Sequence, residues 1–389
     1  MDRSHMRIPQ NQIGLLEALV KINPNIVGVL SGGSAIEMPW HYCCKAIVHG
    51  YLGGQAGAGA MLDVLTGIYN PSGRLNETYP IRYEDTPAFR NFPSTERNSE
   101  YREGIFVGYR YYDTSKVRVQ YPFGYGLSYT KFDYSALEIK ESGVSFSISN
   151  TGERDGAEVA QVYIGGPKGN IFRPDKELKG FQKVYLKAGE SKLVTISFDD
   201  KTFRYWNTKT NQWEVEGGIY TVFVGTNVSN ICLTGHIRKE ATTDQQPYKP
   251  EKMKKYFSGL IQDVTENEFE ELLGYPIPLG KWAGELGIND ALCQMYYAKS
   301  RFARFAYRIL TKKKVQNEEM GKPDLNLLFI YNIPFRGIAK MTGGKVSMEM
   351  AEGLVDMVNG HFLKGFGKVV GGFFANARKN RKYEKKLVD

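Results

Sequence analysis

The spacing of apolar residues predicts an α/β arrangement in the first third of the chain. Ile13, Leu16 and Leu19 recur at helical intervals, and residues 25–30 then form a short apolar run that ends in small polar residues. A short apolar run that ends in this way is typical of a buried strand in a parallel sheet. Residues 1–131 therefore read as alternating helices and strands.

The pattern changes at residue 132 to short alternating strands separated by turn residues. Apolar and polar side chains alternate over residues 144–149, and strands are also predicted at residues 157–164, 193–198 and 220–225. This period of two indicates an all-β module over residues 132–238. Within it, Trp206 and Trp213 flank a turn-like stretch, for which we expect packing in a hairpin rather than a platform for sugar.

A polar, proline-containing linker at residues 239–250 precedes a helical segment at residues 251–389. Thr265 and Glu268 have the spacing of a capping box, which predicts a helix start, and further helices are expected over residues 291–310 and 347–362. Residues 366–374 are apolar, rich in glycine and flanked by basic residues. We expect this stretch to pack on neighbouring helices, with contact to a membrane surface as the alternative.

Charge and cysteine content narrow the classes of partner. The net charge of +9 is concentrated near the C-terminus in short basic runs, which we interpret as solvated helix faces rather than a nucleic-acid site. No apolar run is long enough for a membrane span. The four cysteines and five histidines lack metal-ligand spacing, and the glycines at 53–60 do not match a dinucleotide-binding loop. We therefore expect a protein of the reducing cytoplasm without a metal or cofactor.

Several short motifs occur in one order along the first half of the chain. Residues 121–130 read YPFGYGLSYT and follow GYRY at 108–111, while DVLTG at 63–67 and NPSGRL at 70–75 lie upstream and KELKGF at 176–181 lies downstream. Together they resemble the C-terminal portion of glycoside hydrolase family 3, of the β-glucosidase type. The resemblance covers roughly the first 240 residues.

The resemblance implies a multidomain fold. Residues 1–131 would be part of an α/β sandwich domain, and residues 132–238 a fibronectin type III-like sandwich of the immunoglobulin-like kind. The linker at 239–250 would then lead to an α-helical C-terminal appendage at 251–389.

The resemblance also implies where the chemistry of the intact enzyme would lie. Retaining glycosidases need two carboxyl groups about 5–5.5 Å apart. In this family the nucleophilic aspartate is on a (β/α)8 barrel, and the acid/base glutamate precedes an Asp-Arg pair. Asp2 and Arg3 would match that pair as a substrate-binding remnant of the acid/base loop, so we expect no catalytic residue in this chain. We assign structural roles to Glu37, as a domain contact, and to Glu103, as a partner of an arginine.

By resemblance, the intact enzyme would hydrolyse the O-glycosyl bond of an oligosaccharide or β-glycoside, whereas this chain alone is predicted to be inactive without a barrel. The alternative is a non-catalytic module that binds carbohydrate or docks onto a separate barrel. A remnant without function is a third possibility. The identity of the sugar and the oligomeric state stay open.

Overall fold

The computed structural model describes residues 5–94, 98–278, 284–320, 322 and 324–388. Among the described residues, contacts along the chain form two compact units, one of residues 5–94 and 98–278 and the other of residues 284–320, 322 and 324–388.

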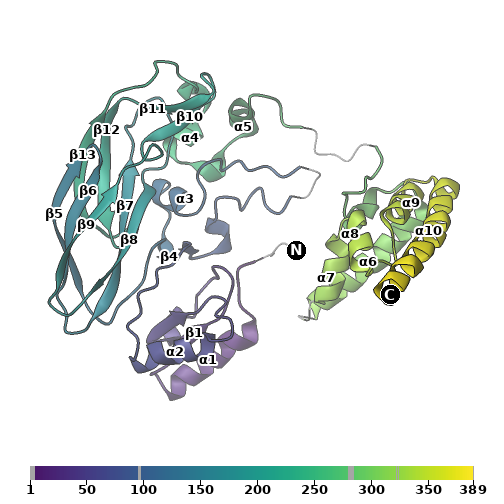
Figure 1. Cartoon of the computed structure of the whole chain (residues 1–389), viewed down its shortest axis with the longest axis horizontal. Helices are drawn as coiled ribbons and strands as arrows, with labels where there is room; N and C mark the ends of the chain where they lie inside the picture. Colours follow the sequence, from purple (N-terminus) through teal and green to yellow (C-terminus); the bar gives the residue numbers. More distant parts are fainter. Residues whose placement is uncertain (1–4, 95–97, 279–283, 321, 323, 389) are drawn as a thin grey trace. The chain divides into compact units, whose positions relative to one another are not determined.

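The first unit begins with a small α/β part. The helix α1 (Gln10–Ile22) leads to β1 (Val27–Leu30), which pairs in parallel with β2 (Ala46–His49), and α2 (Gly57–Thr66) follows. Gly67 ends α2 with φ of 77°, a left-handed conformation that glycine adopts without strain. The predicted order of helix and parallel strand is therefore confirmed (Figure 1).

The α/β part has its own hydrophobic core. Trp40 and Tyr79 are almost fully buried in it, with Met6, Ile13, Ala35 and Met38. Tyr79 belongs to the short strand β3 (Tyr79–Pro80), which pairs with β4 (Val119–Tyr121). In the sequence, the helix α3 (Tyr109–Thr114) comes between these two strands. This core therefore joins segments that are far apart in the sequence.

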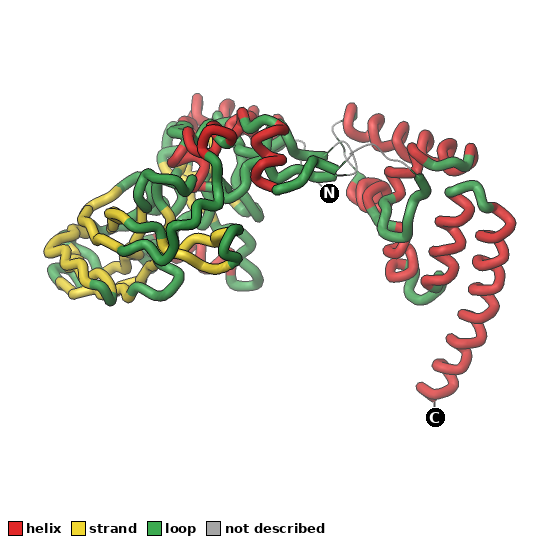
Figure 2. Tube along the Cα trace, turned by 90° about the horizontal axis from the view of Figure 1, so that it is seen from above, coloured by secondary structure: helices red, strands yellow, loops and turns green. Residues whose placement is uncertain are grey.

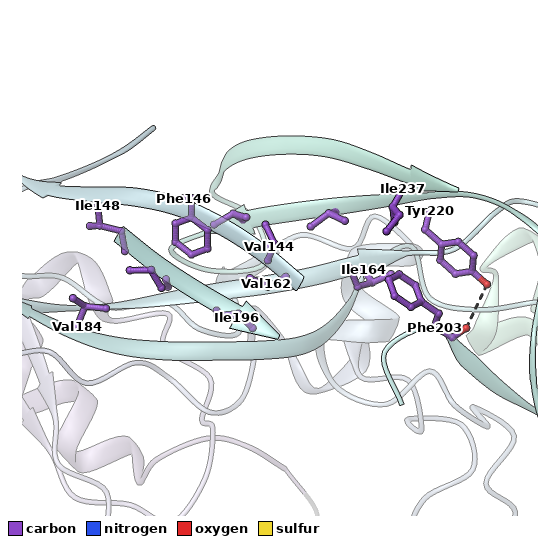
Figure 3. Packing of buried hydrophobic residues seen from close by; sticks show 14 of the residues in the cluster. Val144, Phe146, Ile148, Val162, Ile164, Val184, Ile196, Phe203, Tyr220 and Ile237 are labelled. Atoms are coloured by element: carbon purple, nitrogen blue, oxygen red, sulfur yellow. Dashed lines mark hydrogen bonds between the residues drawn. The ribbon is translucent and has the colours of Figure 1, made fainter. Parts of the chain in front are cut away.

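Two antiparallel sheets form the middle of the first unit and share one hydrophobic core (Figure 3). One has the order β5-β6-β9 and the other β13-β12-β7-β8. Their bounds are Phe132–Lys140 for β5, Gly143–Asn150 for β6, Gly156–Gly165 for β7, Glu177–Leu186 for β8, Ser191–Ser197 for β9, Gly218–Gly225 for β12 and Ile231–Lys239 for β13. All four predicted strands are confirmed, because each overlaps β6, β7, β9 or β12.

The two tryptophans lie in a separate hairpin of β10 (Arg204–Asn207) and β11 (Gln212–Val215). Trp206 and Trp213 face each other across the strands, with ring centroids 5.4 Å apart at 75°, and the guanidinium of Arg204 lies over the Trp213 ring. Hairpin packing is therefore confirmed.

Two helices after the linker also belong to the first unit. They are α4 (Lys254–Ser258) and α5 (Glu266–Leu273), preceded by 3-10 turns at Pro250–Lys252 and Ile261–Asp263. Thr265 and Glu268 form the predicted capping box at the start of α5. Tyr256 and Phe269 pack against Phe106 and Phe172, so the helical segment is divided near residue 279 rather than acting as one body from residue 251.

The second unit is built from helices joined by loops (Figure 2). They are α6 (Arg301–Glu319), α7 (Leu325–Asn332), α8 (Phe335–Met341), α9 (Met348–Val358) and α10 (Phe362–Val388). Leu286, Met295, Phe335 and Val355 are among the buried residues of its core.

Two predicted helices in this unit have different bounds. The range 291–310 divides into a 3-10 helix at Leu292–Tyr297 and α6, because Ser300 caps a new helix with its side chain. The range 347–362 ends earlier, at Val358, and Gly360 follows with φ of 93°. None of the described helices is long and apolar enough to cross a membrane.

Candidate functional site

Asp2 and Arg3, the predicted remnant of the acid/base loop, lie outside the described residues. The nearest described part of the chain runs beside the loop after β1, where the Glu37 N–H donates to the Met6 carbonyl oxygen at 2.8 Å. Ligand contacts in α/β sheets are commonly found at such strand ends. This loop therefore lies where an α/β sheet commonly places its ligand contacts.

Glu37 holds two loops together. Its Oε1 accepts a hydrogen bond from the backbone N–H of Tyr83 at 2.8 Å, and Tyr83 begins a 3-10 turn after β3. Glu37 thus uses one carboxylate oxygen to hold the backbone at Tyr83, 46 positions away in the sequence. The contact agrees with the structural role predicted for Glu37.

Glu103 differs from its predicted role, because it does not pair with an arginine. Its neighbour Arg102 instead binds Glu100 at 2.6 Å and Glu266 at 3.5 Å. The Glu103 side chain is buried, and Oε2 has no hydrogen-bond partner among the described residues. Burial raises the pKa of Glu103, and a hydrogen bond with its own backbone opposes this shift. Arg102 therefore pairs with Glu100 and Glu266, which are more exposed than Glu103. Glu103 stays buried without a pairing to this arginine.

A cavity of about 340 Å³ lies beside α3 in the first unit. Its lining includes Tyr109, Tyr112, Lys116 and Thr78, and Asp113 supplies the one carboxylate among the lining residues. Asp113 Oδ1 is 3.1 Å from Lys176 Nζ, whereas Oδ2 has no partner among the described residues. The cavity offers a hydrogen-bonding surface of small-molecule size, but its lining lacks the second carboxyl group that glycoside hydrolysis needs.

The sequence motifs meet at the junction between the α/β part and the two antiparallel sheets. The side-chain oxygen of Asn70 accepts hydrogen bonds from the Ser128 hydroxyl at 3.0 Å and the Tyr129 N–H at 2.8 Å. Its amide donates to the Asp155 carbonyl oxygen at 2.9 Å. Asn70 thus joins the 70–75 motif to the 121–130 motif and to the turn before β7.

A buried polar network continues this junction into β7. Arg74 and Glu158 form an ion pair of 2.8 Å, and their side chains are only 8% and 4% exposed. The Gln161 amide donates to the carbonyl oxygens of Gly124 and Thr226, while its Oε1 accepts from the Tyr163 hydroxyl at 2.6 Å. Buried polar groups of this kind require a satisfied network. Sequence reasoning missed Arg74, Glu158 and Gln161, although polar residues within an otherwise apolar strand were a signal.

The motif at 176–181 is held to α3 by ion pairs. Lys176 pairs with Asp113 as described above, and Arg110 Nε lies 3.4 Å from Glu177 Oε1. The Leu178 N–H also donates to the Tyr109 hydroxyl at 2.8 Å. These motifs therefore position domains against one another. Among the described residues, no group of three or more histidine, cysteine or acidic side chains could hold a metal ion.

Comparison with family models matches both parts of the first unit. Residues 1–129 match the C-terminal domain of glycosyl hydrolase family 3, and residues 158–228 match the fibronectin type III-like domain. The chain belongs to glycoside hydrolase family 3. It carries the C-terminal portion of such a protein, together with helices at its own C-terminus.

Curated relatives that hydrolyse glycosides by name agree with this assignment. Thermostable β-glucosidase B of Acetivibrio thermocellus is 38% identical over 369 residues, which is 92% of this chain and 44% of that protein. An exo-α-(1→6)-L-arabinopyranosidase of Bifidobacterium breve is 43% identical over 63% of this chain and 33% of its own length. The chain thus spans less than half the length of these relatives.

Solved β-glucosidase structures share the fold of the larger part of this chain. The crystal structure of the Bifidobacterium adolescentis β-glucosidase matches with a TM-score of 0.61 and 39% identity, covering 70% of this chain and 39% of that one. The Kluyveromyces marxianus β-glucosidase in complex with glucose matches with a TM-score of 0.59 and 40% identity, over 61% of this chain and 30% of that one.

Proposed function

We propose that this chain is the C-terminal part of a retaining glycoside hydrolase that releases a terminal sugar from an oligosaccharide or β-glycoside. The observation that carries this proposal is the match to the family 3 domain together with the β-glucosidase relatives. A retaining enzyme would act through a covalent glycosyl-enzyme intermediate, which needs a nucleophile and an acid/base group at once.

The isolated chain is proposed to be inactive. The cavity beside α3 contributes a single carboxylate, and Glu37 uses one oxygen to hold the Tyr83 backbone, which supports the absence of a working carboxyl pair. Asp2 and Arg3 are proposed to be a substrate-binding remnant beside the position of the acid/base glutamate. Catalysis by such enzymes depends on holding both carboxyl groups in place around the sugar.

The test is hydrolysis of an aryl β-glucoside by the purified chain, with the Acetivibrio β-glucosidase as the positive control. We expect no turnover above buffer. Turnover that survives further purification and is abolished by Glu37→Gln or Asp113→Asn would contradict the proposal.

A second candidate function is docking onto a separate barrel, and the exposed sheet of the α/β part favours it. β1 and β2 form a two-stranded parallel sheet, and Val27 and Val29 on β1 are 47% and 49% exposed. Parallel sheets are normally covered on both faces. Val27 and Val29 lie on the same face of β1, and we propose that a segment supplied with the barrel covers this face.

This candidate is tested by adding the separately produced N-terminal portion of the Acetivibrio relative and measuring aryl glucoside hydrolysis. Activity should appear with the wild-type chain and with Leu193→Asp, an exposed apolar residue on β9, but not with Val29→Asp. Saturable binding of cellobiose without complementation would indicate a carbohydrate-binding module instead. Absence of both results would favour a remnant without function.

We also propose the type of β-sandwich, the domain boundaries and the location of the chain. The shared core of the two antiparallel sheets supports an immunoglobulin-like sandwich. The end of the first matched range at residue 129 and the end of β13 at Lys239 support domain boundaries near residues 131 and 238. The four cysteines are unpaired, which supports a reducing cytoplasmic location.

A further inference from the structure

The net positive charge of the chain lies entirely in its helical C-terminal segment. Residues 281–389 contain 20 lysines and arginines against 10 acidic residues, whereas residues 1–280 contain 31 against 32. The net charges are therefore +10 and −1. Such a division points to a partner of the second unit that carries negative charge.

One face of α10 is used for packing within the second unit. A Cβ atom at Gly353 of α9 would lie 2.7 Å from the Gly365 carbonyl oxygen, and one at Gly372 would lie 2.6 Å from Met350 Cγ. Glycine at these positions lets α9 and α10 approach closely. Lys364 and Lys368 add ion pairs to Asp356 of α9, at 3.2 and 2.9 Å.

The opposite face of α10 is apolar and exposed. Phe362, Phe366 and Phe373 follow one another at helical spacing, and Leu363 and Phe374 lie beside them. These five side chains are between 52% and 86% exposed. A continuous aromatic face of this kind marks an interaction surface rather than isolated apolar residues.

Basic residues continue α10 beyond this face. Arg378, Lys379 and Arg381 are exposed and form no ion pair with the described residues. The sequence adds Lys382, Lys385 and Lys386, with Glu384 as the one acidic residue between positions 362 and 388. The helix thus joins an aromatic face to an end of the chain that is rich in lysine and arginine.

We propose that α10 lies flat on an anionic lipid surface, with its aromatic face at the level of the acyl chains and its cationic end among the headgroups. An amphipathic helix that carries phenylalanines on one face and many lysines and arginines elsewhere binds membranes in this way without crossing them. Phosphate contacts alone would explain the charge of α10 but not its exposed phenylalanines, so a lipid fits better than a nucleic acid.

The experiment is co-sedimentation of the full chain with phosphatidylcholine vesicles that contain or lack phosphatidylglycerol. We expect binding to the anionic vesicles, weakened by salt, and none to the neutral ones. The double variant Arg378→Gln, Lys379→Gln should weaken partitioning about 30-fold, since each cationic residue near an anionic surface contributes about fivefold. The double variant Phe366→Ser, Phe373→Ser should also weaken it, by roughly tenfold or more.

Matched controls come from the first unit. Lys183→Gln, Lys209→Gln and Phe181→Ser change exposed residues of the same types and should leave vesicle binding unchanged. Circular dichroism confirms that each variant remains folded. The proposal is overturned by absence of binding to anionic vesicles, or by equal losses in the controls. A dimer that the phenylalanine variant dissociates, or tighter binding to a DNA duplex that this variant retains, would overturn it as well.

Discussion

The ion pair of Arg74 and Glu158 lies at the junction of the α/β part and β7, where both side chains are nearly inaccessible to water. Glu158 Oε1 also accepts the Val159 N–H at 2.8 Å, so its charge is fixed in place. Removing the arginine would leave a buried carboxylate without a counter-charge, which costs about 3–5 kcal/mol.

We therefore predict that Arg74→Ala lowers the free energy of unfolding by about this amount, measured by urea denaturation. The matched control is Lys140→Ala, which removes an exposed ion pair with Glu138 and should cost at most about 1 kcal/mol. Equal effects of the two variants would show that the junction does not depend on this pair.

Glu103 gives a prediction on pH. Burial raises its pKa in the folded state above the ordinary value of 4.5, so the folded chain retains this proton to a higher pH than the unfolded chain. The contribution of Glu103 to the free energy of unfolding consequently declines as the pH rises through this interval. Glu103→Gln removes the decline and should stabilise the protein at pH 7, by an amount on the order of 1 kcal/mol.

Below the ordinary pKa of glutamate, Glu103 is protonated and as neutral as the glutamine of the Glu103→Gln variant. The gain in the free energy of unfolding should therefore disappear at such a pH. Chemical denaturation at neutral and acidic pH measures this change. Glu153→Gln, at an exposed position, serves as the control and should show no such pH-dependent gain. A variant that is less stable than wild type at pH 7 would refute the account of Glu103.

At the scale of elements, the pairing of α9 and α10 depends on glycine at defined positions. A Cβ at Gly365 would collide with the Gly353 carbonyl oxygen and Met357, whereas a Cβ at Gly367 would meet no atom within 4 Å. Gly365→Ala should therefore cost about 1–3 kcal/mol through overpacking. Gly367→Ala should instead gain about 0.5–1 kcal/mol from helix propensity.

Helical circular dichroism followed on heating distinguishes the two alanine variants. We expect a lower midpoint of thermal unfolding for Gly365→Ala and an equal or higher midpoint for Gly367→Ala. A similar shift for both variants would mean that close approach of the two helices is not what requires the glycine.

Elements with a clear local signal were predictable from the sequence. The alternation at residues 144–149 appears as β6, and the Thr265 capping box begins α5, because each pattern depends on neighbours close in the chain. The break between Tyr297 and Arg301 was missed, since helical periodicity continues across it and only the Ser300 cap marks the new helix.

Candidate-site geometry was less predictable, because it depends on contacts distant in sequence. The Asp113–Lys176 and Arg74–Glu158 pairs join residues more than 60 positions apart, and no periodicity indicates them. Glu103 was assigned an arginine partner because Arg102 is adjacent. Arg102, however, pairs with Glu100 and with Glu266 at the start of α5.

At the scale of the whole molecule, the two units differ in composition and in their match to family models. The first contains both matched family 3 domains, and the second is a helical body with the excess positive charge. The sequence motifs between residues 63 and 181, which resemble those of family 3, were enough to predict the domains of the first unit. The inclusion of α4 and α5 in that unit required the structure, because Tyr256 and Phe269 find their partners at Phe106 and Phe172.

Intact-mass spectrometry after incubation with an activated 2-deoxy-2-fluoroglucoside tests whether this chain carries a nucleophile, because the reagent traps the glycosyl-enzyme intermediate of retaining enzymes. We expect the purified chain to keep its mass of 44.0 kDa, while the Acetivibrio β-glucosidase gains one sugar under the same conditions. Stoichiometric attachment of a fluoroglucosyl group to a carboxylate of this chain would show that it holds a nucleophile of its own, and would contradict the account.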